Sequence, residues 1–283
     1  MLARQIGKVV RSPQIYQTLA TIGFGFVMGV VPGLIAAKST VAIAGIGVGA
    51  IAFWFISLRL QRPNIDVTIR SPITIRSSQD KQQYARQGFV GFVPAYTPKR
   101  ESAADKLSAV ERLEAIKNLD FDRLGVEESN LQPTIEAICS HQSRLKYCWL
   151  LATEGTSTVS SLPYTQFLVE YLQQRRGVDC NFYYGDNYTI SMDDDALVLG
   201  KTYDLVHRIF QKEVKNKLPA QQMVADISTG VRSMILGMVL ACLDEERDIE
   251  FVGSKYENDG KIKKDSLCPI IFSFTPDVKV GNR

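Results

Sequence analysis

The chain has 283 residues, a formal net charge of +3 at pH 7 and five cysteines. The positive charge lies at one end, because residues 1–65 carry six basic and no acidic side chains, whereas the rest carries 27 basic and 30 acidic ones. A basic nucleic-acid-binding protein would carry its charge on the folded part, so direct DNA binding is not expected. An odd number of cysteines without a Cys-x-x-Cys pair favours buried reduced thiols, and two scattered histidines give no reason to expect a metal site.

Two apolar runs near the N-terminus predict a pair of transmembrane helices within residues 1–60. Ile15–Ala37 and Val41–Leu58 contain few polar side chains, and a helix of about 20 apolar residues crosses the hydrocarbon core of a bilayer. A cleaved signal peptide has a single short apolar core, which argues against that alternative. A buried hairpin is the other alternative, but the glycines of both runs would penalise helices in water and favour close helix packing in lipid.

The charges that flank these runs predict their orientation. Basic side chains precede the first run and follow the second, with a single one between the runs. They are Arg4, Lys8, Arg11, Lys38, Arg59 and Arg62. Because the positive-inside rule places such flanks in the cytoplasm, both termini and the domain that follows are expected on the cytoplasmic side of the inner (cell) membrane.

The next segment, residues 61–144, is expected to connect the membrane helices to the main domain. Apolar and polar residues alternate in 61–78, which predicts extended structure. The glycines and prolines of 79–104 predict a polar, turn-rich connector. Apolar residues at spacings of three predict a helix over 102–118, and Pro133 near the start of 131–140 favours another short helix there.

From residue 145 to residue 283, apolar segments alternate with helical ones. The expected strands are Tyr147–Ala152, Val178–Tyr184, Gln222–Ile227, Ile249–Gly253 and Pro269–Phe274. The expected helices are Pro163–Arg175, Ala196–Lys215 and Thr229–Glu245. Apolar strands separated by helices predict a parallel sheet covered on both faces. The expected fold class is therefore α/β: two N-terminal transmembrane helices followed by a Rossmann-like domain.

A hydroxyl-rich loop follows the first of these expected strands. Ligands of open parallel sheets bind beyond the carboxyl ends of the strands, and hydroxyls with a glycine before a helix suit phosphates and ribose. The candidate binding residues are Thr153, Glu154, Gly155, Thr156, Ser157 and Thr158. An ordinary helix-capping loop is the alternative. The loop has neither the glycines of a dinucleotide fingerprint nor the lysine of a P-loop, which argues against an ATPase.

A second loop joins the third expected strand to its helix. Its candidate binding residues are Asp226, Ser228, Thr229, Gly230, Val231 and Arg232. Gly230 and the free amides at a helix start would hold a phosphate, and Arg232 would add a charge-assisted hydrogen bond. Helix capping by Asp226 or Ser228 is the alternative.

The segment Asp-Ile-Ser-Thr-Gly-Val-Arg-Ser-Met at 226–234 resembles the Asp-x-Thr-Gly-Gly-Thr-Lys-x-Met signature of CARF domains, the CRISPR-associated Rossmann folds. Thr-Glu-Gly-Thr-Ser at 153–157 is similar to that family's first ligand loop. The resemblance covers about residues 145–275 and implies a homodimer that binds a cyclic oligoadenylate across its two-fold axis. Two positions depart from the signature, because Thr229 replaces a glycine and Val231 a hydroxyl residue, which bears on the detailed contacts and on any cleavage of the ligand.

The resemblance implies a membrane-anchored receptor of type III CRISPR antiviral defence, whose output is altered membrane integrity. Cyclic tetra-adenylate is the expected ligand, although no motif encodes the ring size, and no cofactor is expected. The alternative is a membrane-tethered Rossmann-fold enzyme that acts on nucleotides, for example a ring nuclease that cleaves its cyclic ligand, with no catalytic residue identified. A structural anchor without a ligand is a third reading.

Overall fold

The computed structural model describes residues 64–69, 72–155, 160–245, 247–255 and 266–279. The chain divides into two compact units, one of Val67–Asp277 and one of Met1–Asp66 with Val278–Arg283. Both predicted transmembrane runs lie outside the described residues. Within the described ranges, no helix combines the length and apolar character that spanning a bilayer requires.

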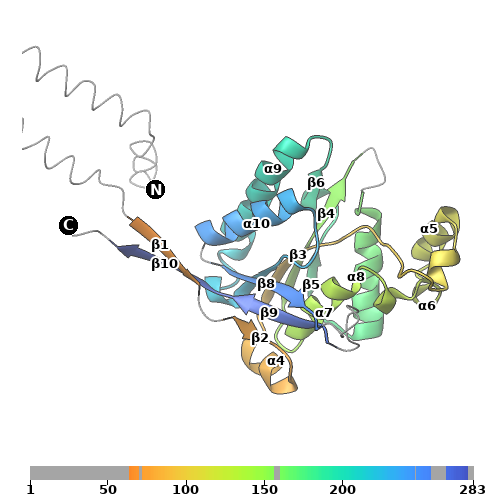
Figure 1. The fold of residues 1–283 in the computed structure, drawn as a ribbon, viewed down its shortest axis with the longest axis horizontal. Helices are drawn as coiled ribbons and strands as arrows, with labels where there is room; N and C mark the ends of the chain where they lie inside the picture. The colour runs from red at the N-terminus through yellow and green to blue at the C-terminus, as the bar shows by residue number, and fades with distance from the viewer. Residues whose placement is uncertain (1–63, 70–71, 156–159, 246, 256–265, 280–283) are drawn as a thin grey trace, which may run out of the picture. The chain divides into compact units, whose positions relative to one another are not determined.

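A mixed sheet organises the Val67–Asp277 unit (Figure 1). In the described residues it has eight strands in the order β2–β9–β8–β7–β3–β4–β5, with β6 paired to β4. The strands are β2 (Ile73–Thr74), β3 (Gly88–Phe92), β4 (Tyr147–Glu154), β5 (Asn181–Tyr183), β6 (Thr189–Ser191), β7 (Met223–Asp226), β8 (Asp248–Gly253) and β9 (Cys268–Phe272). A separate two-stranded sheet pairs β1 (Asn64–Ile69) with β10 (Phe274–Lys279).

The central strands are parallel, as the alternation of expected strands and helices predicts. Strands β8, β7, β3, β4 and β5 pair in parallel, in that order. The expectation that Pro269–Phe274 joins the parallel set is wrong, because β9 runs antiparallel to β8, and β2 runs antiparallel to β9. An apolar run indicates that a strand is buried on both faces, but it does not indicate whether the strand runs parallel or antiparallel to its neighbour.

The strand at the centre of the sheet, β3, lies in the segment expected to be a polar connector, so that expectation is wrong. β3 is fully buried between β4 and β7. A Cβ at Gly88 would lie 2.0 Å from the Met223 sulfur, and one at Gly91 would lie 2.6 Å from the Phe89 ring. These glycines serve close packing inside a strand, where the sequence suggested turns.

Helices cover both faces of the sheet (Figure 1). They are α4 (Ser78–Tyr84), α5 (Ala109–Lys117), α6 (Phe121–Leu124), α7 (Gln132–His141), α8 (Pro163–Arg176), α9 (Asp195–Arg208) and α10 (Arg232–Asp244). One core packs α9 and α10 over Val90, Trp149 and Met223. The other packs α7 and α8 over Phe89 and Leu150. Because neighbouring strand residues point to opposite faces, β3 and β4 contribute to both cores.

Local signals explain where α5 begins. The Ser108 hydroxyl oxygen accepts a hydrogen bond from the Glu111 amide at 3.2 Å, and the Glu111 carboxylate accepts one from the Ser108 amide at 2.8 Å. This capping box divides the helix expected over 102–118 into a 3₁₀ turn at Ala104–Lys106 and α5.

The other expected helices are confirmed with shifted ends. The helix expected over 131–140 is α7, and that over 163–175 is α8. α9 continues as a π-helix, Ile209–Val214, over most of its expected length. The expected boundary between residues 144 and 145 falls inside the Val67–Asp277 unit, since β2 and β3 belong to the same sheet as the later strands.

Trp149 of β4 contacts both the edge strand β5 and the segment that follows α9. Its buried indole stacks on Tyr183 of β5 with ring centroids 4.9 Å apart, and its N–H donates to Glu213 at 2.8 Å. The Lys217 ammonium lies 5.7 Å from the centre of the Trp149 ring and donates to the Tyr183 hydroxyl at 2.9 Å. Aromatic stacking and a cation–π contact thus tie β4 and β5 to the segment after α9.

Candidate functional site

The strand order reverses at β3. From β3 the chain proceeds to β4 and β5 on one side, and then returns to β7 and β8 on the other. In open α/β sheets, ligands bind at such a reversal, beyond the carboxyl ends of the strands. Those ends are Phe92 in β3 and Asp226 in β7. The second candidate loop leaves the sheet here, and the first leaves β4 on the other side of β3.

Asp226 anchors the loop that follows β7. Its Oδ1 atom accepts hydrogen bonds from the Ser228 amide, at 3.1 Å, and from the Ser228 hydroxyl. The Ser228 hydroxyl oxygen also accepts from the amide of Val252 in β8, 2.7 Å away. Ser228 therefore links β7 to β8, and Asp226 holds it in that position.

Thr229 and Gly230 hold the same loop against the end of β3. The Thr229 hydroxyl donates to the Phe92 carbonyl oxygen at 2.9 Å and lies 3.3 Å from the Thr134 hydroxyl of α7. Gly230 has a φ of +104°, and a Cβ there would lie 2.7 Å from the Phe92 ring. Only glycine fits this position without strain.

The start of α10 leaves backbone donors available. The helix begins three residues later than expected, because Gly230 has a positive φ and Val231 is extended. No side chain caps this end, so its first amides lack intrahelical acceptors and its dipole favours an anion. Arg232 is exposed, and none of the ion pairs found in the described part of the chain includes it. Amides and a guanidinium in this arrangement suit a phosphate.

Thr153 closes the base of the first candidate loop. Its amide donates to the Ser161 hydroxyl oxygen at 2.8 Å, and the Ser161 amide donates to the Thr153 hydroxyl oxygen at 3.0 Å. The Ser160 hydroxyl donates to the Thr153 carbonyl oxygen at 3.1 Å. Thr153 is therefore buried in the loop's own framework, whereas Glu154 is exposed and Gly155 is half-buried. The candidates outside the described residues are Thr156, Ser157 and Thr158.

A buried polar cluster lies behind Asp226, and two of its members were not identified from the sequence. Asp226, Glu250 and His141 are all 0% exposed. Glu250 is the partner of Asp226 across the β7–β8 ladder and lies 2.9 Å from Nε2 of His141. The sequence signal for this cluster is a glutamate with apolar neighbours on both sides, Ile249 and Phe251, in β8.

The environment of Asp226 favours its neutral form. Burial, and then the charge of Glu250, raise the pKa of Asp226 well above its usual range, whereas the hydrogen bonds from Ser228 act to lower it. Over the described ranges, no group of three or more His, Cys, Asp or Glu side chains is arranged to hold a metal ion.

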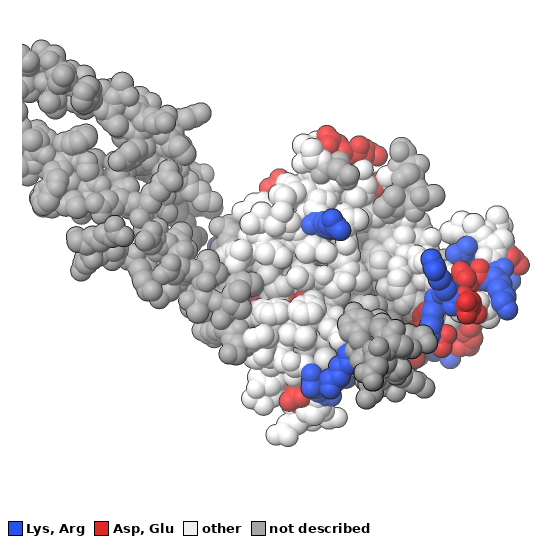
Figure 2. Space-filling model, viewed as in Figure 1, with Lys and Arg blue, Asp and Glu red and all other residues white. Residues whose placement is uncertain are grey.

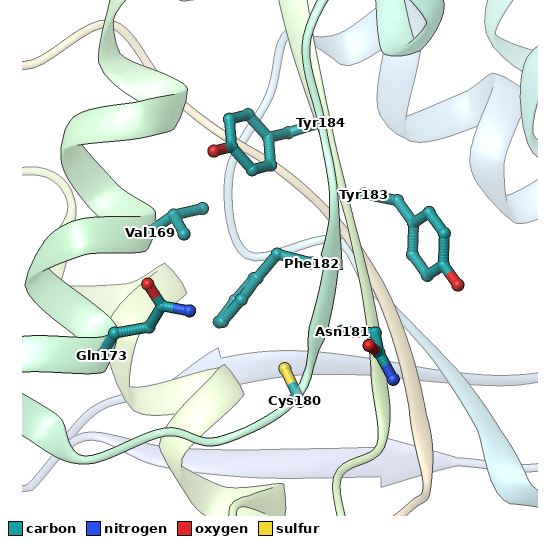
Figure 3. Close-up of a pocket in the computed structure, with 7 residues that line it drawn as sticks. All are labelled: Val169, Gln173, Cys180, Asn181, Phe182, Tyr183 and Tyr184. Carbon is teal, nitrogen blue, oxygen red and sulfur yellow. The ribbon is translucent and has the colours of Figure 1, made fainter.

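An open cavity of about 350 Å³ lies elsewhere, between the edge strand β5 and α8 (Figure 3). Its walls are residues 180–184 together with Val169 and Gln173 of α8. Phe182 and Tyr184 point toward α8, while Tyr183 points to the other side of the strand. None of the candidate binding residues lines this cavity.

Charged side chains are unevenly distributed over the face shown in Figure 2. They gather over α5 and α6, where both signs are present, and the centre of this face is mostly uncharged. Arg123 and Glu111 form one ion pair in that region, 3.5 Å apart, and Arg175 pairs with Asp122 at 2.7 Å. Among the described residues, this face shows no basic stripe of the kind that binds a nucleic-acid backbone.

Comparisons with known proteins give limited matches. No protein-family model matches the sequence, and no curated protein matches it. The fold is similar to a solved structure of Can2 from Sulfobacillus thermosulfidooxidans in complex with cyclic tetra-adenylate, at 12% identity and a TM-score of 0.32. The match covers 62% of this chain and 36% of that one, so the chain spans about a third of the length of the solved protein. The α/β assignment thus stands on this chain's own strand order and packing.

Proposed function

We propose that this protein is a receptor for a cyclic oligoadenylate, which binds at the carboxyl edge of the α/β sheet. The observation that carries the proposal is the start of α10 at the reversal point of the sheet. There Gly230 with its positive φ, an uncapped helix end and the exposed Arg232 lie in the segment that follows β7. Helix amides and an arginine recognise phosphate groups, so a ligand with several phosphates fits this edge.

The choice of a cyclic oligoadenylate rests on the resemblance of residues 226–234 to the CARF signature. Binding across the two-fold axis of a homodimer would bring two α10 starts to one ring of phosphates. The first candidate loop would contact the same ring from β4, through the exposed Glu154 and through residues 155–158. We place the protein in type III CRISPR defence on the same ground.

The N-terminal runs supply the proposed output. The acid-free, apolar residues 1–60 would anchor the protein in the cell membrane, and ligand binding would change how their helices associate and whether they admit ions. For this to happen, the ligand must bind one arrangement of the helices more tightly than the other. Dye release from vesicles that contain the full chain, measured with and without ligand, tests this step. No ligand-dependent release would remove the membrane output.

Calorimetry tests the receptor directly. Full-length protein in detergent micelles is titrated with cyclic tetra-adenylate, cyclic hexa-adenylate and, as a control, linear tetra-adenylate. We expect one of the cyclic ligands to bind, and Arg232→Ala to weaken that binding by about 1.5–3 kcal/mol, or roughly 10- to 150-fold, because a charge-assisted hydrogen bond is lost.

Arg144→Ala is the matched control. It removes the same charge from an exposed arginine just before β4, at the amino edge of the sheet, and should leave the affinity unchanged. Equal losses in both variants would point to a general charge effect. No heat with any cyclic ligand would reject the proposal.

Chromatography of the ligand after incubation separates the receptor from the alternative enzyme. If the protein is only a receptor, the cyclic oligoadenylate is recovered intact. If it is a ring nuclease, linear fragments are recovered.

A further inference from the structure

The buried pair Asp226 and Glu250 has a geometry that the proposed binding role does not use. The two residues are register partners on the parallel strands β7 and β8, so their side chains lie on the same face of the sheet, about 5 Å apart at the backbone. Neither side chain reaches solvent. Two ionised carboxylates in this position would repel each other without the screening that water provides.

Each carboxyl group has one engaged oxygen and one oxygen without a partner. Oδ1 of Asp226 accepts from Ser228, and Oε2 of Glu250 lies 2.9 Å from His141. Oδ2 of Asp226 and Oε1 of Glu250 are buried and have no hydrogen-bond partner among the described residues. Buried polar atoms are almost always bonded, so these two atoms require an explanation.

His141 does not supply a compensating positive charge. Its Nδ1 atom accepts a hydrogen bond from the Arg86 amide at 3.0 Å, so Nδ1 carries no proton. The proton of the neutral ring is then on Nε2 and is donated to Glu250. The Arg86 guanidinium is engaged with Asp248 at 2.8 Å.

The other groups around the pair do not compensate it either. Arg247, which precedes β8, lies over the Phe210 ring with its guanidinium carbon 5.1 Å from the ring centre, in the core on the opposite face. β3 carries no ionisable side chain, and β9 carries only Cys268. Glu136 of α7, the helix over this face, is paired with Arg176.

We propose that Asp226 is protonated in the folded protein and donates its proton from Oδ2 to Oε1 of Glu250. The pair then holds one proton and one negative charge, and every oxygen of the two carboxyl groups has a partner. Asp226 acts as a positioning residue, because its Oδ1 remains free to hold Ser228 and so shapes the loop that leads to α10. One further consequence rests on the proposed function. A neutral Asp226 places less negative charge near the proposed phosphate site than an ionised Asp226 would.

The sign of the pH effect follows from the raised pKa of Asp226. In the unfolded chain this aspartate loses its proton near its ordinary pKa of about 3.9, whereas in the folded protein it keeps the proton to a higher pH. Its contribution to stability is therefore greatest below that ordinary pKa and is lost as the pH rises toward the folded pKa. Within this window, the group makes the unfolding equilibrium constant rise up to tenfold per pH unit.

Unfolding of the full chain in detergent, followed from about pH 5 to pH 7, tests the proposal. Asp226→Asn mimics the protonated acid, since its oxygen accepts from Ser228 and its amide group donates to Glu250. We expect this variant to lose the tenfold-per-unit dependence. Glu250→Gln should weaken it, because the repelling charge is gone and the amide can donate to an ionised Asp226, while burial still raises the pKa of Asp226. Asp204→Asn, an exposed position in α9, should keep it. The same slope in Asp226→Asn and the unaltered protein would overturn the proposal.

Infrared spectroscopy gives a direct reading that does not depend on unfolding. The folded protein at neutral pH should show a protonated-carboxyl band, which Asp226→Asn removes and Asp204→Asn retains. Absence of that band in the unaltered protein would also overturn the proposal.

Calorimetry with cyclic tetra-adenylate then separates this proposal from the proposed function. Binding to the unaltered protein should weaken as the pH rises, and binding to Asp226→Asn should not. A protein that shows the carboxyl band but binds no ligand would reject the receptor and leave the shared proton in place.

Discussion

Gly230 determines the shape of the candidate loop through its backbone conformation. Because its φ is +104° and a Cβ would lie 2.7 Å from the Phe92 ring, Gly230→Ala should lower the free energy of unfolding by about 1–3 kcal/mol. Gly155→Ala is the matched control in the first candidate loop. Its Cβ would meet Met192 at 3.6 Å, an ordinary contact, so its effect should stay within about 0.5 kcal/mol. Urea titration of both variants checks this, and equal stabilities would contradict it.

At the same scale, the positions of the loop residues could be predicted, but their partners could not. Apolar runs locate the ends of β4 and β7, and therefore the loops that follow. The partner of Ser228 is Val252 on the next strand, and the partner of Thr229 is Phe92, which is 137 positions away in the chain. No local pattern encodes such pairings. The hydroxyls of Ser228 and Thr229, which the sequence offers to a ligand, are therefore bonded within the protein.

The crossing of α9 and α10 depends on one of two helical glycines. A Cβ at Gly237 in α10 would lie 2.5 Å from the Leu199 carbonyl oxygen, whereas a Cβ at Gly200 in α9 would meet nothing within 4 Å. Gly237→Ala should therefore destabilise the protein by about 1–3 kcal/mol through overpacking. Gly200→Ala should stabilise it by about 0.5–1 kcal/mol, because alanine favours the helix. Thermal unfolding of the pair checks the opposite signs; shifts in the same direction would argue against this packing.

At the scale of helices and strands, the sequence predicted the elements that can be recognised from their own residues. Four of the five strands expected after residue 145 belong to the parallel set, because apolar segments that alternate with helices are typical of parallel strands. β3 could not be recognised, because Gly88 and Gly91 look like turn residues until the neighbouring Met223 and Phe89 are known. Tertiary contacts override local preference at both glycines.

At the scale of the whole molecule, the membrane prediction depends on charge and hydropathy and has a topological test. Ser39→Cys lies in the short turn between the two apolar runs. A membrane-impermeant maleimide should label it in intact spheroplasts, since the positive-inside rule places this turn outside. The unaltered protein is the control, because its five cysteines all follow residue 138 and should react only after lysis. Labelling of Ser39→Cys only after lysis would contradict the predicted orientation.

The division of the chain was harder to predict than its fold class. Composition separates the acid-free N-terminal stretch from the rest, since that contrast is written in the sequence itself. The boundary expected at residue 145 rested on where obvious strands begin, and it falls inside one compact unit because β2 and β3 come earlier. Unit boundaries depend on which segments pack together, and that information is not local.

The buried indole of Trp149 gives this protein a natural optical probe. It sits in β4, a few residues before the first candidate loop, and it stacks on Tyr183. The other tryptophan of the chain is Trp54 in the second apolar run. With Trp54 replaced by phenylalanine, all tryptophan fluorescence would come from Trp149 in β4. That fluorescence would then report changes at this edge of the sheet.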